Sequence, residues 1–258
     1  MQNNNPRISF MVIGAAKCGT SALHQYMVKH PHVGSGKNKE IHYFDNTNHF
    51  STYHLNYDEY HQAFDFSSNK KHYGDFTPDY IYFQESARLI WRYNRNIKLI
   101  ILLRNPIERA FSHWNMETKY AHVIDTLPFG EAIRTEHFRC RAYLPEQHGH
   151  FSYIDRGFYT EQIRRFKRLF PEEQILILKY DDFKNEQEKT LRRVFEFIGV
   201  DPNLYQYEHR LTHYIPYHEK LKPEDHLYLL NTFQHEIHAL EQMLGWDCSS
   251  WLEPPTTE

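Results

Sequence analysis

The sequence predicts an α/β fold in which a doubly wound, mainly parallel sheet is flanked by helices. Short apolar segments alternate with segments of helical periodicity along the 258 residues, as in chains built from βα units. One segment, Ile97–Leu103, is almost continuously apolar, which is typical of a central parallel strand covered on both faces. Between the first apolar segment and the first helical one lies Gly14–Ala22, whose small residues predict a P-loop-like turn.

Strands and helices are predicted in turn along the chain. Five segments are predicted to form strands: Ile8–Ile13, Lys39–Phe44, His72–Phe76, Ile97–Leu103 and Ile175–Leu178. Helical periodicity predicts a helix that begins near Ser21 and others over Tyr57–Phe64, Glu85–Arg95, Ile107–Lys119, Tyr153–Phe170, Thr190–Ile198 and Leu227–Leu244. Pro106 precedes one of these helices, and Gly199 and Gly245 end two others, which are the positions these residue types favour.

We expect a single domain over residues 1–258, with a flexible N-terminus at residues 1–6. The segment 120–151 is less regular, because it contains Pro128, Pro145 and Gly149 and lacks sustained periodicity. It is long for a simple connection, so we expect a lid or a segment that faces the substrate.

The charge balance limits the classes of partner. The chain has 30 basic and 33 acidic residues and an isoelectric point of about 6.7, which predicts neither nucleic acid nor an anionic membrane as a partner. Residues 1–6 are polar and lack the apolar region of a secretory signal, and no apolar run is long enough to span a bilayer. We therefore expect a soluble cytoplasmic protein, of an oligomeric state that the sequence does not indicate.

Cysteine and histidine usage predicts neither a disulfide framework nor a metal site. Cys18, Cys140 and Cys248 are widely spaced and odd in number, which fits a reducing compartment. The chain has 19 histidines, and His148 and His150 lie close together, but none has the spacing to a cysteine or carboxylate of a recognised metal site. Surface and cleft histidines account for most of this content, so no metal is predicted.

The turn at Gly14–Ala22 differs from the common nucleoside-triphosphate loop. In that loop lysine directly precedes the Ser or Thr that binds magnesium, whereas here Lys17 precedes Gly19 in the middle of the turn. A lysine at this position can reach the bridging oxygen of a bound anhydride, while Thr20 and Ser21 supply hydroxyl donors. This arrangement requires no metal ion. An ordinary strand-to-helix turn with a solvated lysine is the alternative interpretation.

Two further strand ends are predicted to lie at the same edge of the sheet as this turn. Arg104 directly follows the apolar strand Ile97–Leu103, and Ser112 lies two turns into the next helix. A guanidinium and a hydroxyl placed in this way can hold a second phosphate. The turn that follows Phe76 ends the third strand. Ligands of such sheets bind outside the carboxyl ends of the strands, so the sequence suggests a nucleotide phosphorylated at two places.

Four segments carry a resemblance to sulfotransferases that use 3′-phosphoadenosine 5′-phosphosulfate (PAPS). Phe10–Ser21 resembles their 5′-phosphosulfate loop, and Leu103–Ser112 resembles their 3′-phosphate motif. Lys39–Asp45 and Tyr153–Tyr159 are similar to segments of the heparan sulfate sulfotransferase branch and its bacterial relatives. The resemblance extends from about Ile8 to Trp251, with all four motifs in the expected order. In type it is nearest to bacterial, cyanobacterial natural-product sulfotransferases.

The resemblance implies a role for individual residues. Lys17 would stabilise the departing phosphate, and Glu40 would be the general base, with His42 as the alternative base. A salt bridge from Glu40 to Lys17 or Lys39 is compatible with that role. The residues that would hold the nucleotide are Lys17, Cys18, Gly19, Thr20, Ser21 and Ala22 around the 5′-phosphate, and Arg104 and Ser112 around the 3′-phosphate. Arg156 is a further candidate for the 3′-phosphate, with an ion pair to a carboxylate at a helix start as the alternative.

Two departures from the family pattern bear on the acceptor. In the glycan-modifying branch the turn that matches Asp75–Pro78 usually carries a lysine where this chain has Phe76, which weakens the case for an anionic polysaccharide. That branch also tends to have a disulfide and a basic, glycine-containing loop over the nucleotide, whereas this chain has His213–Lys220. Lys220 and Lys222 are candidates for closing over the phosphates, and equally for ordinary surface residues.

The function we expect is transfer of a sulfuryl group from PAPS to a hydroxyl of a small-molecule natural product, such as a polar toxin. A carrier-bound acyl chain, a glycan acceptor and an inactive nucleotide-binding module are alternatives. A kinase is disfavoured because no Lys-Ser/Thr pair or magnesium-binding carboxylate follows the glycine loop. The residues predicted to contact the acceptor, for which core packing is an equal alternative, are Tyr43, Phe44, Asp75, Phe76 and Tyr80.

Overall fold

The computed structural model describes residues 7–52, 54–68, 70–119, 124–207, 217 and 219–254. The chain divides into two compact units. The sheet unit consists of Met1–Leu103 and Arg165–Tyr214, and the helical unit consists of Arg104–Arg164 and Ile215–Glu258. The single domain expected over residues 1–258 stays a prediction. The flexible N-terminus predicted at residues 1–6 lies outside the described residues.

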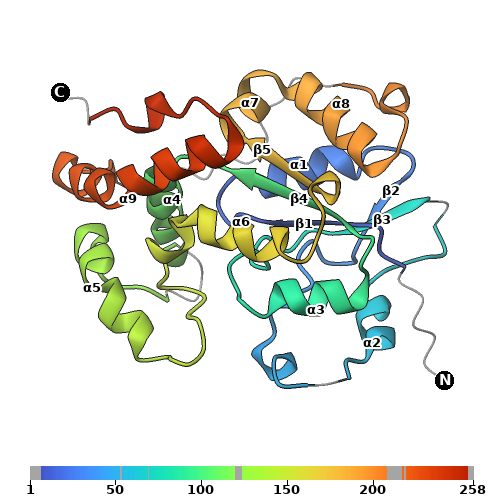
Figure 1. Cartoon of the computed structure of the whole chain (residues 1–258), viewed down its shortest axis with the longest axis horizontal. Coiled ribbons are helices and arrows are strands. Elements are labelled where there is room, and N and C mark those ends of the chain that lie inside the picture. The colour runs from blue at the N-terminus through green and yellow to red at the C-terminus, as the bar shows by residue number, and fades with distance from the viewer. Residues whose placement is uncertain are drawn as a thin grey trace. The chain divides into compact units, whose positions relative to one another are not determined.

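The described part of the sheet unit contains a parallel sheet in the order β2-β3-β1-β4-β5 (Figure 1). Its strands are β1 (Phe10–Gly14), β2 (Val33–Ser35), β3 (His72–Asp75), β4 (Lys98–Leu103) and β5 (Ile175–Lys179). The helices of this unit are α1 (Thr20–Met27), α2 (Tyr57–Gln62), α3 (Ser86–Tyr93), α7 (Tyr180–Asn185) and α8 (Gln187–Ile198). Figure 1 shows α1, α7 and α8 on one side of the sheet and α3 on the other, which confirms the predicted doubly wound α/β fold.

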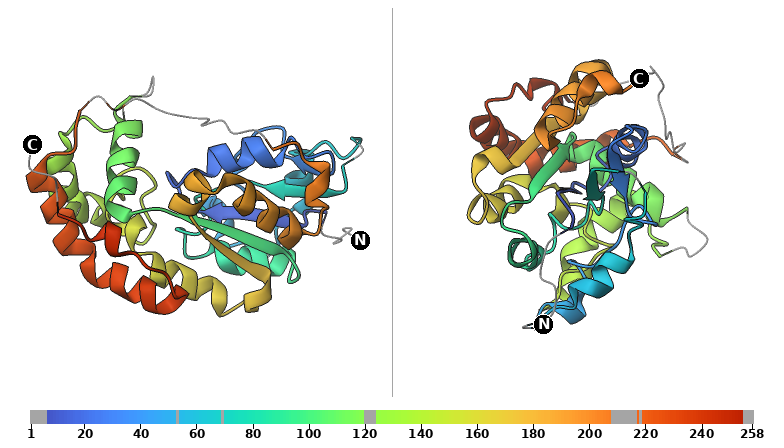
Figure 2. Two further views of the ribbon diagram at one scale, coloured as in Figure 1. Left: turned by 90° about the horizontal axis from the view of Figure 1, so that it is seen from above. Right: turned by 90° about the vertical axis from the view of Figure 1, so that its right-hand side faces the viewer.

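The helical unit is built around a contact between α4 (Pro106–Glu117) and α9 (Pro223–Leu244), which Figure 2 shows from a second direction. It also contains α5 (Phe129–Arg141) and the short 3₁₀ helix η2 (Asp155–Gly157), which packs on α4. Helix α6 (Tyr159–Lys167) begins in this unit and continues past its boundary at Arg164. Proline opens both α4 and α9, as its fixed backbone angle favours.

Some predicted elements differ from those observed. Residues 39–44 do not form the expected strand; they form an irregular loop held by side-chain hydrogen bonds. Strand β2 was not predicted because three residues are too few to show a period. Helix α5 lies within the segment 120–151 expected to be irregular, of which residues 120–123 are outside the described residues. Its sequence is weakly patterned, and Phe138 is exposed on it.

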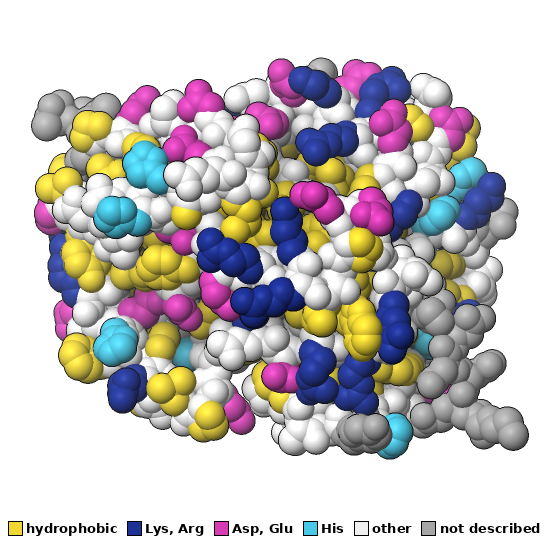
Figure 3. All heavy atoms as spheres, in the orientation of Figure 1, with side chains coloured by type: hydrophobic (Ala, Val, Ile, Leu, Met, Phe, Trp, Pro, Cys, Tyr) yellow, Lys and Arg dark blue, Asp and Glu magenta, His cyan; other side chains and the backbone are white. Residues whose placement is uncertain are grey.

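No helix in the described part of the chain combines the length and the apolar character that a membrane crossing requires. Lysine and arginine side chains are interspersed with aspartate and glutamate side chains on the face drawn in Figure 3, in keeping with the near-balanced composition. Cys18, Cys140 and Cys248 are not joined by disulfide bonds, and Cys18 and Cys248 are buried.

The core of the sheet unit is tightly packed around Phe10, the first residue of β1. Its ring meets the ring of Phe76 edge-on at 5.6 Å, and both side chains are fully buried. Gly74, which pairs with Phe10 across β1 and β3, lies so close that a Cβ atom at this position would overlap the Phe10 ring. Residue 74 must therefore be glycine, because the Phe10 ring leaves no room for a Cβ atom.

We expect Gly74→Ala to lower the free energy of unfolding by about 1–3 kcal/mol, as overpacking of a core typically does. Urea denaturation of the single and double variants measures this. Because the overlap is with the Phe10 ring, Phe10→Leu should cost less in the Gly74→Ala background than in the wild type. Strictly additive losses would contradict the steric explanation.

Candidate active site

The loop between β1 and α1 is fixed by hydrogen bonds at the carboxyl edge of the sheet. The Ala15 N–H donates to the Leu102 carbonyl at 2.8 Å, and the Cys18 N–H donates to the Ala15 carbonyl at 3.1 Å. Gly19 precedes α1 with a φ of 92°, a left-handed conformation that glycine adopts without strain. A Cβ at Gly19 would also lie 2.7 Å from the Tyr180 ring. Glycine is therefore needed here for backbone conformation and for space.

This loop has N–H groups and one cationic side chain, Lys17, which are groups that bind an anion. No side chain caps the N-terminus of α1, so the positive end of the helix dipole faces the loop. Lys17 lies within the turn with a φ of 70° and is partly exposed, and Ser21 is also partly exposed. Thr20 and Cys18 are buried, so Cys18 can contribute little beyond its backbone. Ala22 lies in the first turn of α1 and is partly exposed.

A second loop carries Glu40 and is held by the hydroxyl of Thr77. That oxygen accepts hydrogen bonds from the N–H groups of Ile41 at 2.9 Å and His42 at 3.4 Å. The backbone of His42 has a φ of 54°, a left-handed conformation that costs a non-glycine residue about 1–2 kcal/mol. Thr77 therefore helps to hold Glu40 and His42 in a conformation that the isolated segment would not favour.

The Thr77 hydroxyl in turn donates to the buried carboxylate of Asp75 at 2.7 Å. The other oxygen of Asp75 accepts from the hydroxyls of Tyr60 at 2.9 Å and Tyr80 at 2.8 Å. The Tyr80 oxygen also accepts the N–H of Tyr43 at 3.1 Å. We call Asp75, Thr77, Tyr60 and Tyr80 the Asp75 network. Burial raises the pKa of Asp75 to about 6, although the hydrogen bonds from Thr77, Tyr80 and Tyr60 act to lower it.

The residues predicted to contact the acceptor lie in the interior of the sheet unit. Phe76 packs between the rings of Phe10 and His24, the latter at 4.6 Å. Phe76 therefore fills the core at the position where the glycan-modifying branch usually has lysine. The five predicted contact residues, each at most 7% exposed, are Tyr43, Phe44, Asp75, Phe76 and Tyr80. Their observed contacts are structural, and a part in acceptor binding stays a prediction.

Glu40, His42 and Asp45 form a chain of charged groups. The Nε2 atom of His42 lies 3.4 Å from Glu40 Oε2, and its Nδ1 atom lies 2.7 Å from Asp45 Oδ2. Burial acts to raise the pKa of Glu40, but the His42 hydrogen bond and the neighbouring Lys39 ammonium outweigh it and lower the pKa to about 2. Hydrogen bonds to Asp45 and Glu40 raise the pKa of His42 to about 10. At neutral pH Glu40 is therefore ionised and His42 is protonated.

The Lys17 loop and the Glu40 loop meet the same edge of the sheet. Strands β1 and β3 are parallel neighbours, with Met11 opposite Asp75. The Ile81 N–H, in the turn after β3, donates to the Ile13 carbonyl at 2.8 Å, directly before the Lys17 loop begins. The carboxyl ends of adjacent strands thus place Lys17 and the loop that carries Glu40 at the same edge of the sheet, where ligands of such sheets bind.

Arg104, Ser112 and Arg156 belong to the helical unit. Arg104 is 18% exposed and its guanidinium contacts Glu108 Oε2 at 2.6 Å. Burial acts to lower the pKa of Arg104, but Glu108 and Tyr217 outweigh it and raise the pKa above its usual value. Ser112, partly exposed, lies two turns after the start of α4.

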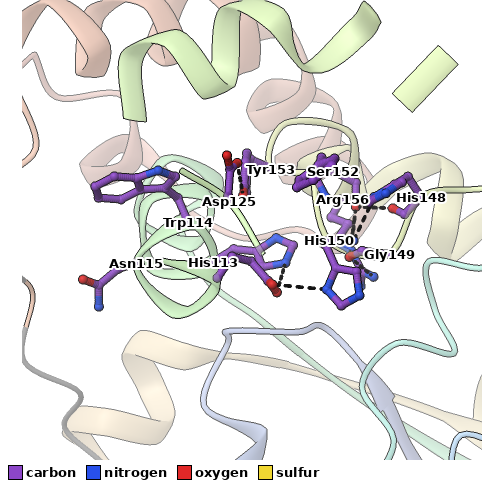
Figure 4. A network of polar contacts seen from close by, with 12 residues as sticks. His113, Trp114, Asn115, Asp125, His148, Gly149, His150, Ser152, Tyr153 and Arg156 are labelled. Atoms are coloured by element: carbon purple, nitrogen blue, oxygen red, sulfur yellow. Dashed lines mark hydrogen bonds and ion pairs between the residues drawn. The ribbon is translucent and has the colours of Figure 1, made fainter. Parts of the chain in front are cut away.

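Arg156 is buried and anchored within the helical unit. Its Nε donates to Ser152 Oγ and a terminal nitrogen donates to the Gly149 carbonyl, both at 2.9 Å (Figure 4). Beside it His113 and His150 contact the Glu117 carboxylate at 3.4 and 3.1 Å. Arg156 therefore serves the internal structure of this unit, and a contact with a 3′-phosphate stays a prediction.

Lys220 and Lys222, the candidates for closing over the phosphates, line a cavity of about 250 Å³ in the helical unit. Most of the segment His213–Lys220 lies outside the described residues. Tyr217 is described, and its ring stacks on Phe111 at 5.2 Å, next to Ser112 in the sequence.

Comparison with known proteins identifies the family. Residues 7–227 match the model of the sulfotransferase domain. Membrane-associated sulfotransferase kil1 of Dictyostelium discoideum is 24% identical over 93% of this chain, and human heparan sulfate glucosamine 3-O-sulfotransferase 5 is 28% identical over 76% of it. The matched regions span 65% and 55% of those relatives' own lengths.

A solved sulfotransferase from Alicyclobacillus acidocaldarius is 25% identical, with a TM-score of 0.80 over 96% of this chain and 99% of that one. The family match and this structural similarity confirm the resemblance that the four sequence motifs indicated. The chain belongs to the sulfotransferase domain family.

Proposed function

We propose that this chain transfers a sulfuryl group from PAPS to a hydroxyl of a small molecule and releases adenosine 3′,5′-bisphosphate. The observation that carries the proposal is the position of two loops at one edge of the sheet, one with Lys17 before an uncapped helix N-terminus and one with an ionised Glu40. Membership of the sulfotransferase domain family supports the donor.

The Lys17 loop suits the donor end of the reaction. Backbone N–H groups at the start of α1 and the Ser21 hydroxyl bind the 5′-phosphate, and the helix dipole favours its charge. Lys17 neutralises the charge that grows on the bridging oxygen as the sulfur–oxygen bond breaks. This chemistry is carried by a lysine and backbone donors, with no step that calls for a metal.

Glu40 is the general base in this proposal. The acceptor oxygen attacks sulfur in line, the bond from sulfur to the bridging oxygen breaks, and the hydroxyl proton passes to the Glu40 carboxylate. His42, the alternative base, is protonated at neutral pH and has no free lone pair for this proton. An acceptor hydroxyl that replaces the His42 hydrogen bond or the Lys39 ion pair raises the pKa of Glu40 and strengthens it as a base.

The surroundings of Glu40 favour a neutral or cationic small acceptor over a polyanionic glycan. The three carboxylates Glu40, Asp45 and Asp79 outnumber the two cations beside them, Lys39 and protonated His42, and Phe76 supplies no further cation. Like charges repel an approaching polysulfated chain. A natural-product alcohol therefore fits better than a heparan-type acceptor.

We expect Glu40→Gln to lower the rate of sulfuryl transfer by about 10²–10⁴-fold because the amide cannot accept the proton. Lys17→Ala should lower it by about 10²–10³-fold through lost charge stabilisation. Rates are followed by the mass shift of a panel of alcohols incubated with PAPS, and bisphosphate binding is measured in parallel.

The matched controls are Glu59→Gln and Lys29→Ala, which alter exposed residues and should leave the rate unchanged. Retention of the full rate in Glu40→Gln would refute the base assignment. Tighter binding of ATP with magnesium than of the bisphosphate would favour a kinase, and bisphosphate binding without transfer to any acceptor would favour an inactive binding module.

Arg104→Ala tests the predicted 3′-phosphate contact. We expect adenosine 3′,5′-bisphosphate to bind roughly 10- to 100-fold more weakly, because a hydrogen bond to a charged group contributes about 1.5–3 kcal/mol. Adenosine 5′-phosphate, which lacks the 3′ group, should bind equally to both forms. Calorimetry measures the binding of both nucleotides, and Arg141→Ala, at an exposed position, is the control. Equal weakening of both nucleotides by Arg104→Ala would contradict the assignment.

Protonation of His42 should make the stability of the folded protein depend on pH. Its pKa of about 10 in the folded protein exceeds the ordinary value of 6.5, so its contribution is complete below pH 6.5 and is lost as the pH rises through 10. His42→Gln should therefore show a smaller fall in Tm between pH 6.5 and 10 than the wild type. His137→Gln is the exposed control, and identical profiles for wild type and His42→Gln would show that His42 does not titrate in this range.

A further inference from the structure

Three potential metal ligands converge beside Glu40 in the sheet unit. His42, Asp45 and Asp79 each offer one ligand atom, and these atoms lie within 4.8 Å of one another. Among the residues that the structure describes, no other group of His, Cys, Asp and Glu side chains meets this criterion. The three come from two segments, the Glu40 loop and the turn after β3.

The two segments are fixed to each other by hydrogen bonds, so the cluster is preorganised. Thr77, two residues before Asp79, accepts the N–H of His42, and Tyr80, the residue after Asp79, accepts the N–H of Tyr43. Ligand atoms around a dication such as Zn²⁺ lie about 2.0–2.2 Å from it and hence roughly 3–4 Å apart. A cation between the three groups thus requires only small shifts.

An unpartnered buried oxygen points to a cation independently of this spacing. The Asp45 side chain is only 4% exposed, and its Oδ2 contacts His42 Nδ1. Its Oδ1 is buried and has no hydrogen-bond partner among the described residues. A buried acceptor without a partner typically costs about 1–3 kcal/mol, and more when it is charged. A bound cation would satisfy this oxygen.

The charges and the outer contacts of the cluster also suit a cation. Two carboxylates, Asp45 and Asp79, face a single imidazole, and Glu40 lies on its far side. When Nδ1 of His42 binds a metal, its Nε2–H remains to donate to Glu40, 3.4 Å away, which is the carboxylate–histidine–metal arrangement common in metal sites. The His42 side chain is 48% exposed, so the cluster is open to solvent.

We propose that His42, Asp45 and Asp79 form a binding site for one transition-metal dication of the Zn²⁺ class. An imidazole with two carboxylates favours Zn²⁺ over Mg²⁺, which binds through oxygen ligands alone. Binding replaces the proton on Nδ1 of His42 with the metal. If Glu40 is the base, as proposed above, the cation also changes the charge beside it, so metal availability and sulfuryl transfer are coupled.

Calorimetric titration of the chelator-stripped chain with Zn²⁺ tests the site without any assay of transfer. We expect one tight site in the wild type and at least tenfold weaker binding in His42→Ala, Asp45→Asn and Asp79→Asn. Because the chain has 19 histidines, His137→Ala and Asp58→Asn, both at exposed positions, serve as controls that should retain the site. Mg²⁺ should produce no comparable binding.

Substitution of buried Asp45 can disturb folding, so two further measurements accompany it. Circular dichroism reports whether each variant folds, and the partly exposed Asp79 supplies a variant that spares the core. Visible absorption of bound Co²⁺ reports its ligands directly. An unchanged tight site in folded Asp79→Asn, a Co²⁺ spectrum unaffected by His42→Ala, or no tight Zn²⁺ binding by the wild type would each overturn the proposal.

Discussion

The buried carboxylate of Asp75 is the interaction on which the candidate site depends. It ends β3, is shielded from solvent and accepts hydrogen bonds from Thr77, Tyr60 and Tyr80. Burial of a charge is unfavourable unless donors surround it, and three hydroxyls meet that requirement here. Two of these hydroxyl oxygens then accept N–H groups of the Glu40 loop. A loop without a strand ladder is thereby tied to the sheet through one carboxylate.

Much of the fold follows from local sequence pattern, and the exceptions have identifiable causes. Three elements are long or apolar enough for the sequence alone to show a strand or helix pattern: β1, β4 and α4. Residues 39–44 look alternating, but Tyr43 and Phe44 at their end, and Asp45 after them, are buried in succession, which a strand with one exposed face does not allow. Their conformation is set by Thr77 and Tyr80, which lie more than 30 residues away.

Some residues of the candidate site can likewise be predicted from local sequence, and others cannot. Lys17, Gly19 and Ser21 are contiguous, so the turn chemistry alone indicates an anion site. Glu40 and His42 were identified through family resemblance, because a single acid on an irregular loop carries no local signal. The hydrogen bonds from the Glu40 loop to Thr77 and Tyr80, and the approach of Asp79 to Asp45, join residues distant in sequence, and no spacing rule reveals them.

The charges around Glu40 impose opposing demands on any catalytic use of it. His42 and Lys39 keep the carboxylate ionised, which a proton acceptor requires, yet the same contacts hold its pKa near 2 and make it a weak base. The conflict is resolved if the acceptor displaces one contact as it binds, since Glu40 is partly exposed whereas the Asp45 contact on the other side of His42 is buried. Asp45 then holds His42 in place while Glu40 is released to take the proton.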